Sequence, residues 1–349
     1  MARGMARLGD KRGSARYRRY IARMCRAIRG QTHVITGTTS GTGLAAAIAL
    51  AMHGVHIVLL NRASPRATAA EIKVRKIADA NGGTVRAIEC DLADFDSVRR
   101  AALEIQSACP QGVDVLCCNA GIMAFPDLPA KQGYDVQMTT NHLSHFLLTK
   151  ELMPLLEKKA NSTPDGEARV VHMTSEARRL PGTPFSPRYL NRNGGRLGGE
   201  SSHLQMLTVR GPNWERYHQT KLANALFTYA LHDKLQARGS RVKAMLAHPG
   251  ASFTNLQLTT AGSRGYSTWM LNSVLSLFMM TAEDGSVPML KCMTEPNLES
   301  GAFYAPRWIM IGDAVRIQPE KQLCGTKHAE ESKRILWEES CKAVGDFVL

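Results

Sequence analysis

The chain has 349 residues, of which 44% are hydrophobic and 21% charged, so it is long and apolar enough for a large buried core. Nine Arg and one Lys against a single Asp in residues 1–30 carry most of the net charge of +14, which argues against a nucleic-acid surface on the folded body. None of the 8 cysteines forms a Cys-x-x-Cys pair, so we expect reduced thiols and no metal site.

Residues 1–30 form a basic extension with a helical pattern in its later part. Arginines recur every three or four residues from Arg12 to Arg26, and apolar residues from Tyr17 to Ile28 follow the same period on another face. This pattern is typical of a mitochondrial targeting segment or of a helix that lies on a membrane surface. A solvated basic tail is the alternative, and the lack of a long apolar run argues against a secretory signal.

From Gln31 onward, apolar strand-like runs alternate with helical segments. The expected strands cover 33–36, 55–60, 84–90, 113–118, 169–174 and 241–247, and the expected helices cover 44–52, 66–80, 94–109, 132–158 and 217–237. This order predicts an α/β fold with a doubly wound, Rossmann-type parallel sheet. No change in composition marks a second domain, so residues 31–345 are expected to form one domain.

Three glycines follow the first expected strand and precede a helix. A strand, a glycine turn and a helix together present backbone N–H groups to a phosphate. Gly37 allows the tight turn, Gly41 lets a pyrophosphate approach and Gly43 lets the helix pack close to the strand. The spacing Gly-x-x-x-Gly-x-Gly differs from the commonest dinucleotide pattern, and a turn without a ligand is the alternative.

Polar residues follow the next two expected strands. An acid after the second strand would bind the 2′-hydroxyl of NAD, but the chain has Asn61 and Arg62 there. Arg62 therefore favours the 2′-phosphate of NADP, with a plain surface arginine as the alternative. Asp91, after the third strand, is expected either to meet the adenine or to cap the next helix.

Candidates for acid–base chemistry lie later in the chain. Tyr217 and Lys221 are four residues apart, on one face of an expected helix. A neighbouring ammonium stabilises a phenolate, and we therefore expect Lys221 to lower the pKa of Tyr217. Ser175, at the end of the fifth strand, is expected to hold a substrate oxygen beside the phenol, or else is an ordinary residue at a strand end.

Taken together and in order, these motifs resemble the short-chain dehydrogenase/reductase family. The similarity is closest to its retinol dehydrogenase and protochlorophyllide reductase-like branch and covers about residues 31–345. It rests on Thr36-Gly-x-x-x-Gly-x-Gly43, Asn119-Ala-Gly121, Asn141-His-Leu-Ser-His-Phe146, Ser175, Tyr217-x-x-x-Lys221, His248-Pro-Gly250, Ala282-Glu-Asp-Gly-Ser-Val-Pro288, Leu298-Glu-Ser-Gly-Ala-Phe-Tyr304 and Leu336-Trp-Glu-Glu-Ser-Cys341.

The resemblance implies NAD(P)-dependent hydride transfer on a carbonyl or alcohol. Tyr217 would donate or remove the hydroxyl proton, Lys221 would depress its pKa and hold the nicotinamide ribose, and Ser175 would orient the substrate oxygen. Asn141 would support a proton relay through water. The implied cofactor contacts are Gly37, Thr39, Ser40, Gly41, Thr42, Gly43, Asn61, Arg62, Asp91, Leu92, Asn119, Ala120, Gly121, Tyr217, Lys221, Pro249, Gly250 and Thr254.

Three features depart from the family pattern. Thr42 stands where the family usually has Ile. The segment from about 176 to 216 reads as an inserted loop that lines the substrate pocket, meets a partner protein or is a mobile surface excursion. Trp269–Met280 is unusually apolar but too short to span a bilayer, which suggests a lid, an interfacial helix or a core helix.

We therefore expect an NADP-preferring oxidoreductase, with NAD as the other candidate cofactor. Its substrate would be a small lipophilic molecule that is retinoid-, steroid- or lipid-like. The alternative is a catalytically silent subunit with a structural role in a larger, mitochondrial complex. The expected location is mitochondrial or membrane-associated, otherwise cytoplasmic. Residues 1–30 and the 176–216 loop are the candidate contacts with a membrane or partner, a homo-oligomer stays open and no nucleic-acid partner is expected.

Overall fold

The computed structural model describes residues 14–24, 28–181, 185–194, 196–251, 280–318 and 328–349. In this part of the chain one eight-stranded sheet has the order β3-β2-β1-β4-β5-β6-β7-β8. All neighbouring strands are parallel except for β8, which is antiparallel to β7. The strands are β1 (Thr32–Thr36), β2 (His56–Asn61), β3 (Val85–Glu89), β4 (Val115–Cys118), β5 (Ala168–Met173), β6 (Val242–Ala247), β7 (Phe303–Pro306) and β8 (Ala314–Ile317).

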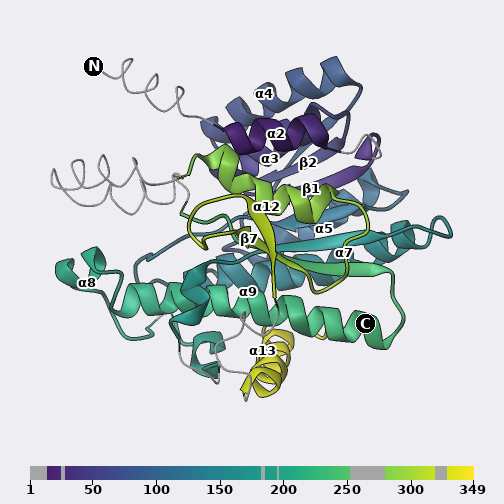
Figure 1. Cartoon of the computed structure of the whole chain (residues 1–349). Helices are drawn as coiled ribbons and strands as arrows, with labels where there is room; N and C mark the ends of the chain where they lie inside the picture. Colours follow the sequence, from purple (N-terminus) through teal and green to yellow (C-terminus); the bar gives the residue numbers. More distant parts are fainter. Residues whose placement is uncertain (1–13, 25–27, 182–184, 195, 252–279, 319–327) are drawn as a thin grey trace, which may run out of the picture.

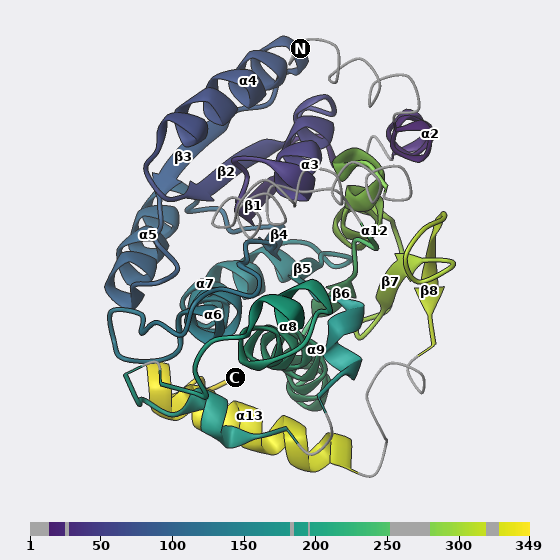
Figure 2. The same cartoon turned by 90° about the vertical axis from the view of Figure 1, so that its left-hand side faces the viewer.

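Helices cover both faces of this sheet (Figures 1 and 2). One face carries α2 (Ala15–Arg23), α3 (Gly41–Ala51), α4 (Pro65–Asn81) and α12 (Ala282–Thr294). The other carries α5 (Phe95–Ala108), α7 (Ser144–Ala160), α9 (Pro212–Ala237) and α13 (Ala329–Val344). A large apolar cluster fills each interface, so the central strands are buried on both sides, as the continuous apolar runs predict. The doubly wound, Rossmann-type sheet is thereby confirmed.

The strand order changes direction between β1 and β4. At this point the chain connections leave on opposite sides, and open α/β sheets bind their ligands outside the carboxyl ends of the strands at such a point. The carboxyl ends of β1, β2, β4, β5 and β6 carry the residues that the sequence singled out, and parallel pairing brings all of these ends to one edge. The fold therefore gathers the candidate site.

The described part of the basic extension is docked on the fold. Tyr17 donates from its hydroxyl to Ala45 O at 2.7 Å and from its backbone N–H to Asp284 Oδ1 at 2.9 Å. Tyr20 bonds to Thr294 Oγ1 at 2.9 Å. Residues 15–24 are thus neither a solvated tail nor a helix whose apolar face is open to a membrane. Residues 1–13 lie outside the described residues, so mitochondrial targeting stays a prediction.

Several boundaries differ from the expectations. The expected helix over 132–158 starts with α6 (Val136–Met138), passes through a π-helical turn, η2 (Thr139–Leu143), and continues as α7. The expected 176–216 loop holds short helices, η3 (Glu176–Arg179), η4 (Pro187–Leu190) and α8 (His203–Leu207). Its last five residues are not loop, because α9 begins at Pro212.

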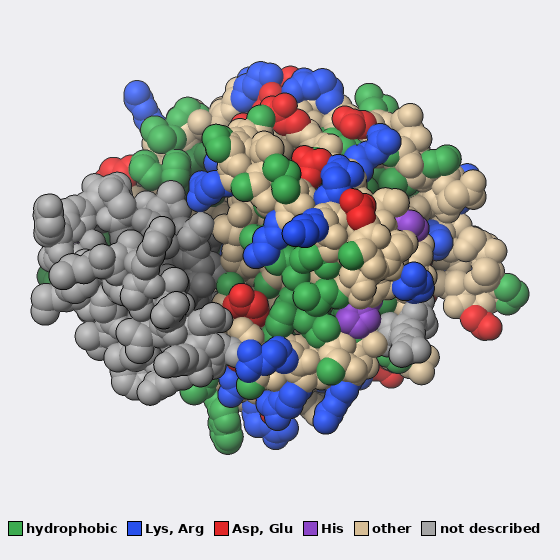
Figure 3. Space-filling view, turned by 90° about the horizontal axis from the view of Figure 1, so that it is seen from above, with side chains coloured by type: hydrophobic (Ala, Val, Ile, Leu, Met, Phe, Trp, Pro, Cys, Tyr) green, Lys and Arg blue, Asp and Glu red, His purple; other side chains and the backbone are tan. Residues whose placement is uncertain are grey.

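On the face seen in Figure 3, charges of both signs are mixed rather than gathered into one field. Figure 3 shows one face, on which Lys and Arg side chains stand among Asp and Glu with apolar groups between them. In the part of the chain that the structure describes, no helix combines the length and the hydropathy that a bilayer crossing requires.

Candidate active site

The glycine turn after β1 is pressed against the end of β4. Gly37 has φ +71°, and a Cβ there would lie 2.8 Å from Ala120 Cα. A Cβ on Gly43 would lie 2.3 Å from Gly37 O and 2.5 Å from Asn119 Nδ2. Any side chain at these two positions would force the backbone apart, so glycine is required for this close packing.

Two asparagines fasten this turn to the sheet. Asn119 donates from Nδ2 to Thr36 O at 2.9 Å and to Gly37 O at 3.1 Å, and its Oδ1 accepts from Thr42 Oγ1 at 3.0 Å. Asn61 Oδ1 accepts from the Thr38 N–H at 2.8 Å. The Thr that replaces the family's usual Ile therefore adds a hydrogen bond beneath the turn. The nucleotide contacts expected of Asn61, Thr42 and Asn119 stay predictions, because their side chains already hold the protein's own turn.

The N-terminus of α3 fits an anionic group. Ser64 and Asp94 cap α4 and α5 through their side chains, whereas Ser40 makes no such bond at α3 within the described residues. The first N–H groups of α3 are thus available to a ligand that accepts hydrogen bonds. The glycines of the turn have no side chains that would block its approach. Residues 37–43 therefore fit the pyrophosphate of a dinucleotide.

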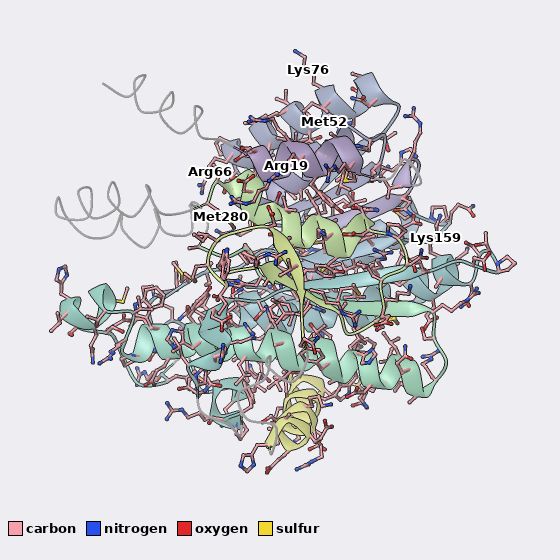
Figure 4. The ribbon with its side chains drawn as sticks, in the orientation of Figure 1. Arg19, Met52, Arg66, Lys76, Lys159 and Met280 are labelled. Carbon is pink, nitrogen blue, oxygen red and sulfur yellow. The ribbon has the colours of Figure 1, made fainter. Side chains whose placement is uncertain are left out.

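The residues after β2 and β3 lie at the same edge of the sheet. Arg62 is exposed and directly follows the last residue of β2, and Arg66, labelled in Figure 4, is exposed in the first turn of α4. Asp91 accepts from the Ala93 N–H at 2.9 Å, while Asp94 is the residue that caps α5. The helix-cap interpretation of Asp91 is therefore wrong, and its contact with adenine stays a prediction, as does that of the buried Leu92.

Tyr217, Ser175 and Lys221 come together at the ends of β5 and α9. The Ser175 side chain lies close enough to the Tyr217 hydroxyl to lower the pKa of the phenol, and Lys221 Nζ lies 5.6 Å from the centroid of the Tyr217 ring. Thr174 Oγ1 donates to Lys221 O at 2.7 Å, which fixes the end of β5 against α9. The structure thus brings together the three side chains that the sequence selected for proton transfer.

Burial dominates the pKa values of this cluster. It raises the pKa of Tyr217 to about 12, although Ser175 acts in the opposite direction. It lowers the pKa of Lys221 to about 8. The net shift of the phenol is upward because desolvation disfavours the phenolate, and burial likewise disfavours the ammonium, so the expected effect of Lys221 on the pKa of Tyr217 stays a prediction.

Asn141 lies in the π-helical turn η2 and holds the residues that follow β4. Its Oδ1 accepts from the Ile122 N–H at 2.8 Å, and its Nδ2 donates to Ile122 O and to Thr220 Oγ1, both at 2.9 Å. A Cβ on Gly121 would lie 3.1 Å from Asn141 Oδ1 and 3.4 Å from Lys221 Nζ. Gly121 thus leaves room for both side chains, and π-helical turns often mark functional sites.

A buried histidine links Asn141 to the glycine turn, and the sequence analysis assigned it no role. His145 Nδ1 lies 3.1 Å from Asn141 O, and its Nε2 lies 2.9 Å from Thr36 Oγ1. Because a carbonyl only accepts, Nδ1 carries the proton and Nε2 accepts from Thr36. Burial lowers the pKa of His145 to about 4, which keeps the ring neutral. Its place in the motif Asn141-His-Leu-Ser-His-Phe146 was the only signal for it.

Arg216, next to Tyr217, is another residue that the sequence analysis missed. Its side chain is 1% exposed and lies 3.4 Å from Asp135 Oδ2 and 3.6 Å from Asp127 Oδ2. It also donates to Gly199 O at 2.9 Å. Arg216 therefore ties the 176–216 segment and the residues before Asn141 to the start of α9.

Apolar residues surround the Tyr217 ring. Trp214 packs edge-on against it, with 6.0 Å between the ring centroids, and its Nε1 donates to Met206 O at 3.2 Å. The same cluster holds Met123, Ala124 and Ala177. The 176–216 segment thus supplies part of an apolar wall beside the phenol.

The remaining predicted residues follow β6. Gly250 has φ +71°, and a Cβ there would lie 2.5 Å from Met310 O. Pro249 and Gly250 follow the strand that pairs with β5, so they lie at the same sheet edge as Ser175. Thr254 and residues 269–279 lie outside the described residues, and their expected roles stay predictions.

Comparison with known proteins agrees with this geometry. Residues 31–190 match the family model of the short chain dehydrogenases. Human retinol dehydrogenase 13 is 30% identical over 322 residues, which is 91% of this chain and 86% of that protein. An uncharacterized oxidoreductase of Schizosaccharomyces pombe is 29% identical over 280 residues, 79% of this chain and 76% of that one. The solved structure of an uncharacterized protein from Mycobacterium paratuberculosis superposes with a TM-score of 0.67 at 30% identity, covering 92% of this chain and 96% of that one.

Proposed function

Since the chain belongs to the short-chain dehydrogenase family and is an NAD(P)-dependent oxidoreductase of its retinol dehydrogenase branch, we propose its reaction and its substrate class. It prefers NADP and transfers a hydride between the nicotinamide and a lipophilic carbonyl or alcohol. Tyr217 is the acid and base of this reaction.

The meeting of four polar side chains at one sheet edge carries this proposal. Ser175 lies close enough to the Tyr217 hydroxyl to lower its pKa, and a Cβ on Gly121 would lie 3.1 Å from Asn141 Oδ1 and 3.4 Å from Lys221 Nζ. These side chains come from three separate parts of the chain, namely the end of β5, the turn η2 and the helix α9, so packing alone gives no reason for their convergence.

Each residue has a physical task in the reaction. When bound, the dinucleotide supplies or accepts the hydride. The Tyr217 hydroxyl gives a proton to the substrate oxygen in reduction and takes it back in oxidation. Ser175 orients that oxygen by a hydrogen bond. The Lys221 ammonium stabilises the phenolate once Tyr217 has lost its proton, and Asn141 supports a proton relay from Lys221 to water.

The cofactor is held along the carboxyl edge of the sheet. Residues 37–43 hold the pyrophosphate, residues 119–121 line the adenosine ribose, and Pro249, Gly250 and Thr254 close around the nicotinamide. Preference for NADP is supported by residues 61–66, which include Arg62 and Arg66 and no acid. A guanidinium matches a 2′-phosphate, whereas an acid there would repel it.

A lipophilic substrate is supported by the surroundings of the phenol. Trp214, Met206 and Met123 give the space beside Tyr217 an apolar wall, which gains free energy by excluding water from an apolar substrate. Retinol dehydrogenase 13 bears a name that points to such a substrate, so retinoids belong in the first set to be tested.

The test is turnover by the purified full chain on a panel of retinoid, steroid and fatty aldehydes and ketones. We expect oxidation of NADPH that depends on the lipophilic compounds, with a higher kcat/KM for NADPH than for NADH. Small hydrophilic ketones serve as the matched poor substrates. Absence of turnover across the panel, together with a partner protein that co-purifies in fixed ratio, would instead favour a silent structural subunit.

A further inference from the structure

His145, in the first turn of α7, is fully buried and uses both of its ring nitrogens. Nδ1 lies 3.1 Å from Asn141 O, and Nε2 lies 2.9 Å from Thr36 Oγ1. His172 on β5 is another fully buried histidine, but neither of its ring nitrogens has a partner in the described ranges of the chain. A buried histidine in this core therefore does not need two bonds, and those of His145 call for their own explanation.

The Nε2 end of the ring reaches the glycine turn. Thr36 is the last residue of β1, directly before that turn, and its hydroxyl oxygen accepts from the N–H groups of Asn119 and Ala120, both at 3.0 Å. A hydroxyl has one proton to donate. The contact with His145 Nε2 at 2.9 Å is shorter than that with Cys117 O at 3.4 Å, so Thr36 donates to the histidine. This bond orients the oxygen that fastens the end of β4 beside the glycine turn.

The Nδ1 end of the ring reaches the π-helical turn η2. It donates to the backbone carbonyl of Asn141, which lies four residues earlier. The side chain of Asn141 in turn holds Ile122 by two bonds, from its N–H at 2.8 Å and to its carbonyl at 2.9 Å. Turns of this kind are rare and occur mostly inside α-helices at functional sites. The bond from His145 therefore helps to fix the backbone from which the Asn141 side chain projects.

We propose that His145 is a positioning residue that holds the glycine turn and Asn141 in one fixed arrangement, with one ring nitrogen assigned to each. Its effect on catalysis rests on the proposed function, in which the glycine turn holds the pyrophosphate and Asn141 supports the proton relay. The two tasks are separable. Loss of the Nε2 bond loosens the dinucleotide turn, whereas loss of the Nδ1 bond displaces Asn141.

Two conservative variants remove one bond each. In His145→Asn the short amide takes the place of Nδ1, so it still donates to Asn141 O but does not reach Thr36. In His145→Gln the longer amide takes the place of Nε2, so it still accepts from Thr36 but leaves Asn141 O without the donor. Each variant is thus the matched control for the other.

Amide hydrogen exchange in the full chain without dinucleotide, followed residue by residue by NMR, measures each end directly. Ala120 N–H donates to Thr36 Oγ1 and therefore reports on the Nε2 end. Ile122 N–H donates to Asn141 Oδ1 and reports on the Nδ1 end. We expect His145→Asn to speed exchange at Ala120 about 3–10-fold and to spare Ile122. His145→Gln should speed exchange at Ile122 and spare Ala120.

Binding and turnover should divide in the same way. His145→Asn should raise the Kd for NADPH about 3–10-fold with a smaller change in kcat. His145→Gln should lower kcat about 10-fold or more with a smaller change in Kd, because a displaced relay group slows proton transfer. A wild type without turnover would count against the proposed function alone, since the exchange measurement needs neither ligand nor substrate.

His172→Gln is the control for the burial of a histidine, and both amides should exchange in it as in the wild type. The ring nitrogen chemical shifts of the wild-type chain give a test that needs no variant, since they should show His145 as the neutral tautomer with the proton on Nδ1. A proton on Nε2 would overturn the proposal. So would His145→Asn and His145→Gln variants in which Ala120 and Ile122 exchange at the wild-type rate, or in which both amides exchange faster to the same extent in either variant.

Discussion

At the scale of single residues, burial decides the resting protonation of the site. Tyr217 and Lys221 lie together as their spacing predicts, but the pKa of the phenol rises to about 12 and that of the amine falls to about 8. The spacing of two residues in a sequence predicts their proximity, not their desolvation, which depends on packing from residues such as Ala124 and Trp214.

Arg216 is a positioning residue with a testable effect on stability. Arg216→Gln leaves the buried carboxyls of Asp127 and Asp135 without their cation, and breaking such a buried pair costs about 3–5 kcal/mol. We expect a lower midpoint of thermal unfolding, and a reduced kcat because the start of α9 carries Tyr217.

Arg99→Gln is the matched control for this substitution, because Arg99 and its partner Asp96 lie at the surface and an exposed pair contributes little. Arg216→Lys keeps the charge without the planar fork, so partial recovery of kcat is expected. An Arg216→Gln variant with the melting midpoint and the kcat of the wild type would show that Arg216 does not position the start of α9.

At the scale of elements, helices and strands with a long regular pattern were predictable, and irregular ones were not. The start of α9 at Pro212 had a signal in Gly211-Pro212, since proline is favoured in the first turn of a helix. The turn η2 had none, because a π-helical turn is maintained by tertiary bonds such as those of Asn141 to Ile122. Strands β7 and β8, four residues each, are too short to show a period.

The helix α2 shows how one pattern suits two structures. Its basic and apolar faces fit a membrane helix, and they equally fit a helix whose apolar face packs on α12 through Tyr17 and Tyr20. Periodicity identifies an apolar face but not the surface that covers it. The bonds of Tyr17 to Ala45 and Asp284 and of Tyr20 to Thr294 distinguish the two.

At the scale of the whole molecule, the fold and the sheet edge that bears the site followed from the β-α alternation, because parallel strands bring their carboxyl ends together. The connections within the site did not follow. His145 lies 109 positions from Thr36, and Arg216 meets Asp127 across the inserted segment. Contacts between residues so far apart in the sequence depend on how helices and strands pack together, and the local sequence pattern does not determine this packing.

The folded molecule is also expected to be sensitive to acid. Burial lowers the pKa of the histidines His33, His142, His145, His172, His218 and His248. Below about pH 6.5 these histidines therefore bind protons in the unfolded chain but stay neutral in the folded one. Each histidine then lowers the free energy of unfolding by up to about 1.4 kcal/mol per pH unit. Full stability is present above that pH and is lost as the pH falls toward the folded pKa values.

Thermal unfolding followed by circular dichroism checks this expectation between about pH 7.5 and pH 5. The melting midpoint should fall steeply, although Asp114 and Asp135 act in the opposite direction because burial raises their pKa. The variant His142→Gln removes one titrating ring and should give a shallower slope. A midpoint that stays constant over this range would mean that the histidines take up protons without unfolding.

The most direct test of the account is the effect of Tyr217→Phe on kcat, measured with saturating NADPH and the best substrate of the panel. The account predicts a loss of about 10²–10⁴-fold in kcat that far exceeds any change in the Kd for NADPH, because Tyr217 is the proton donor and only one of many residues expected to contact the dinucleotide. Tyr229→Phe, on the same helix, should retain the wild-type kcat. A Tyr217→Phe enzyme with undiminished kcat would contradict the assignment of Tyr217 as the acid and base.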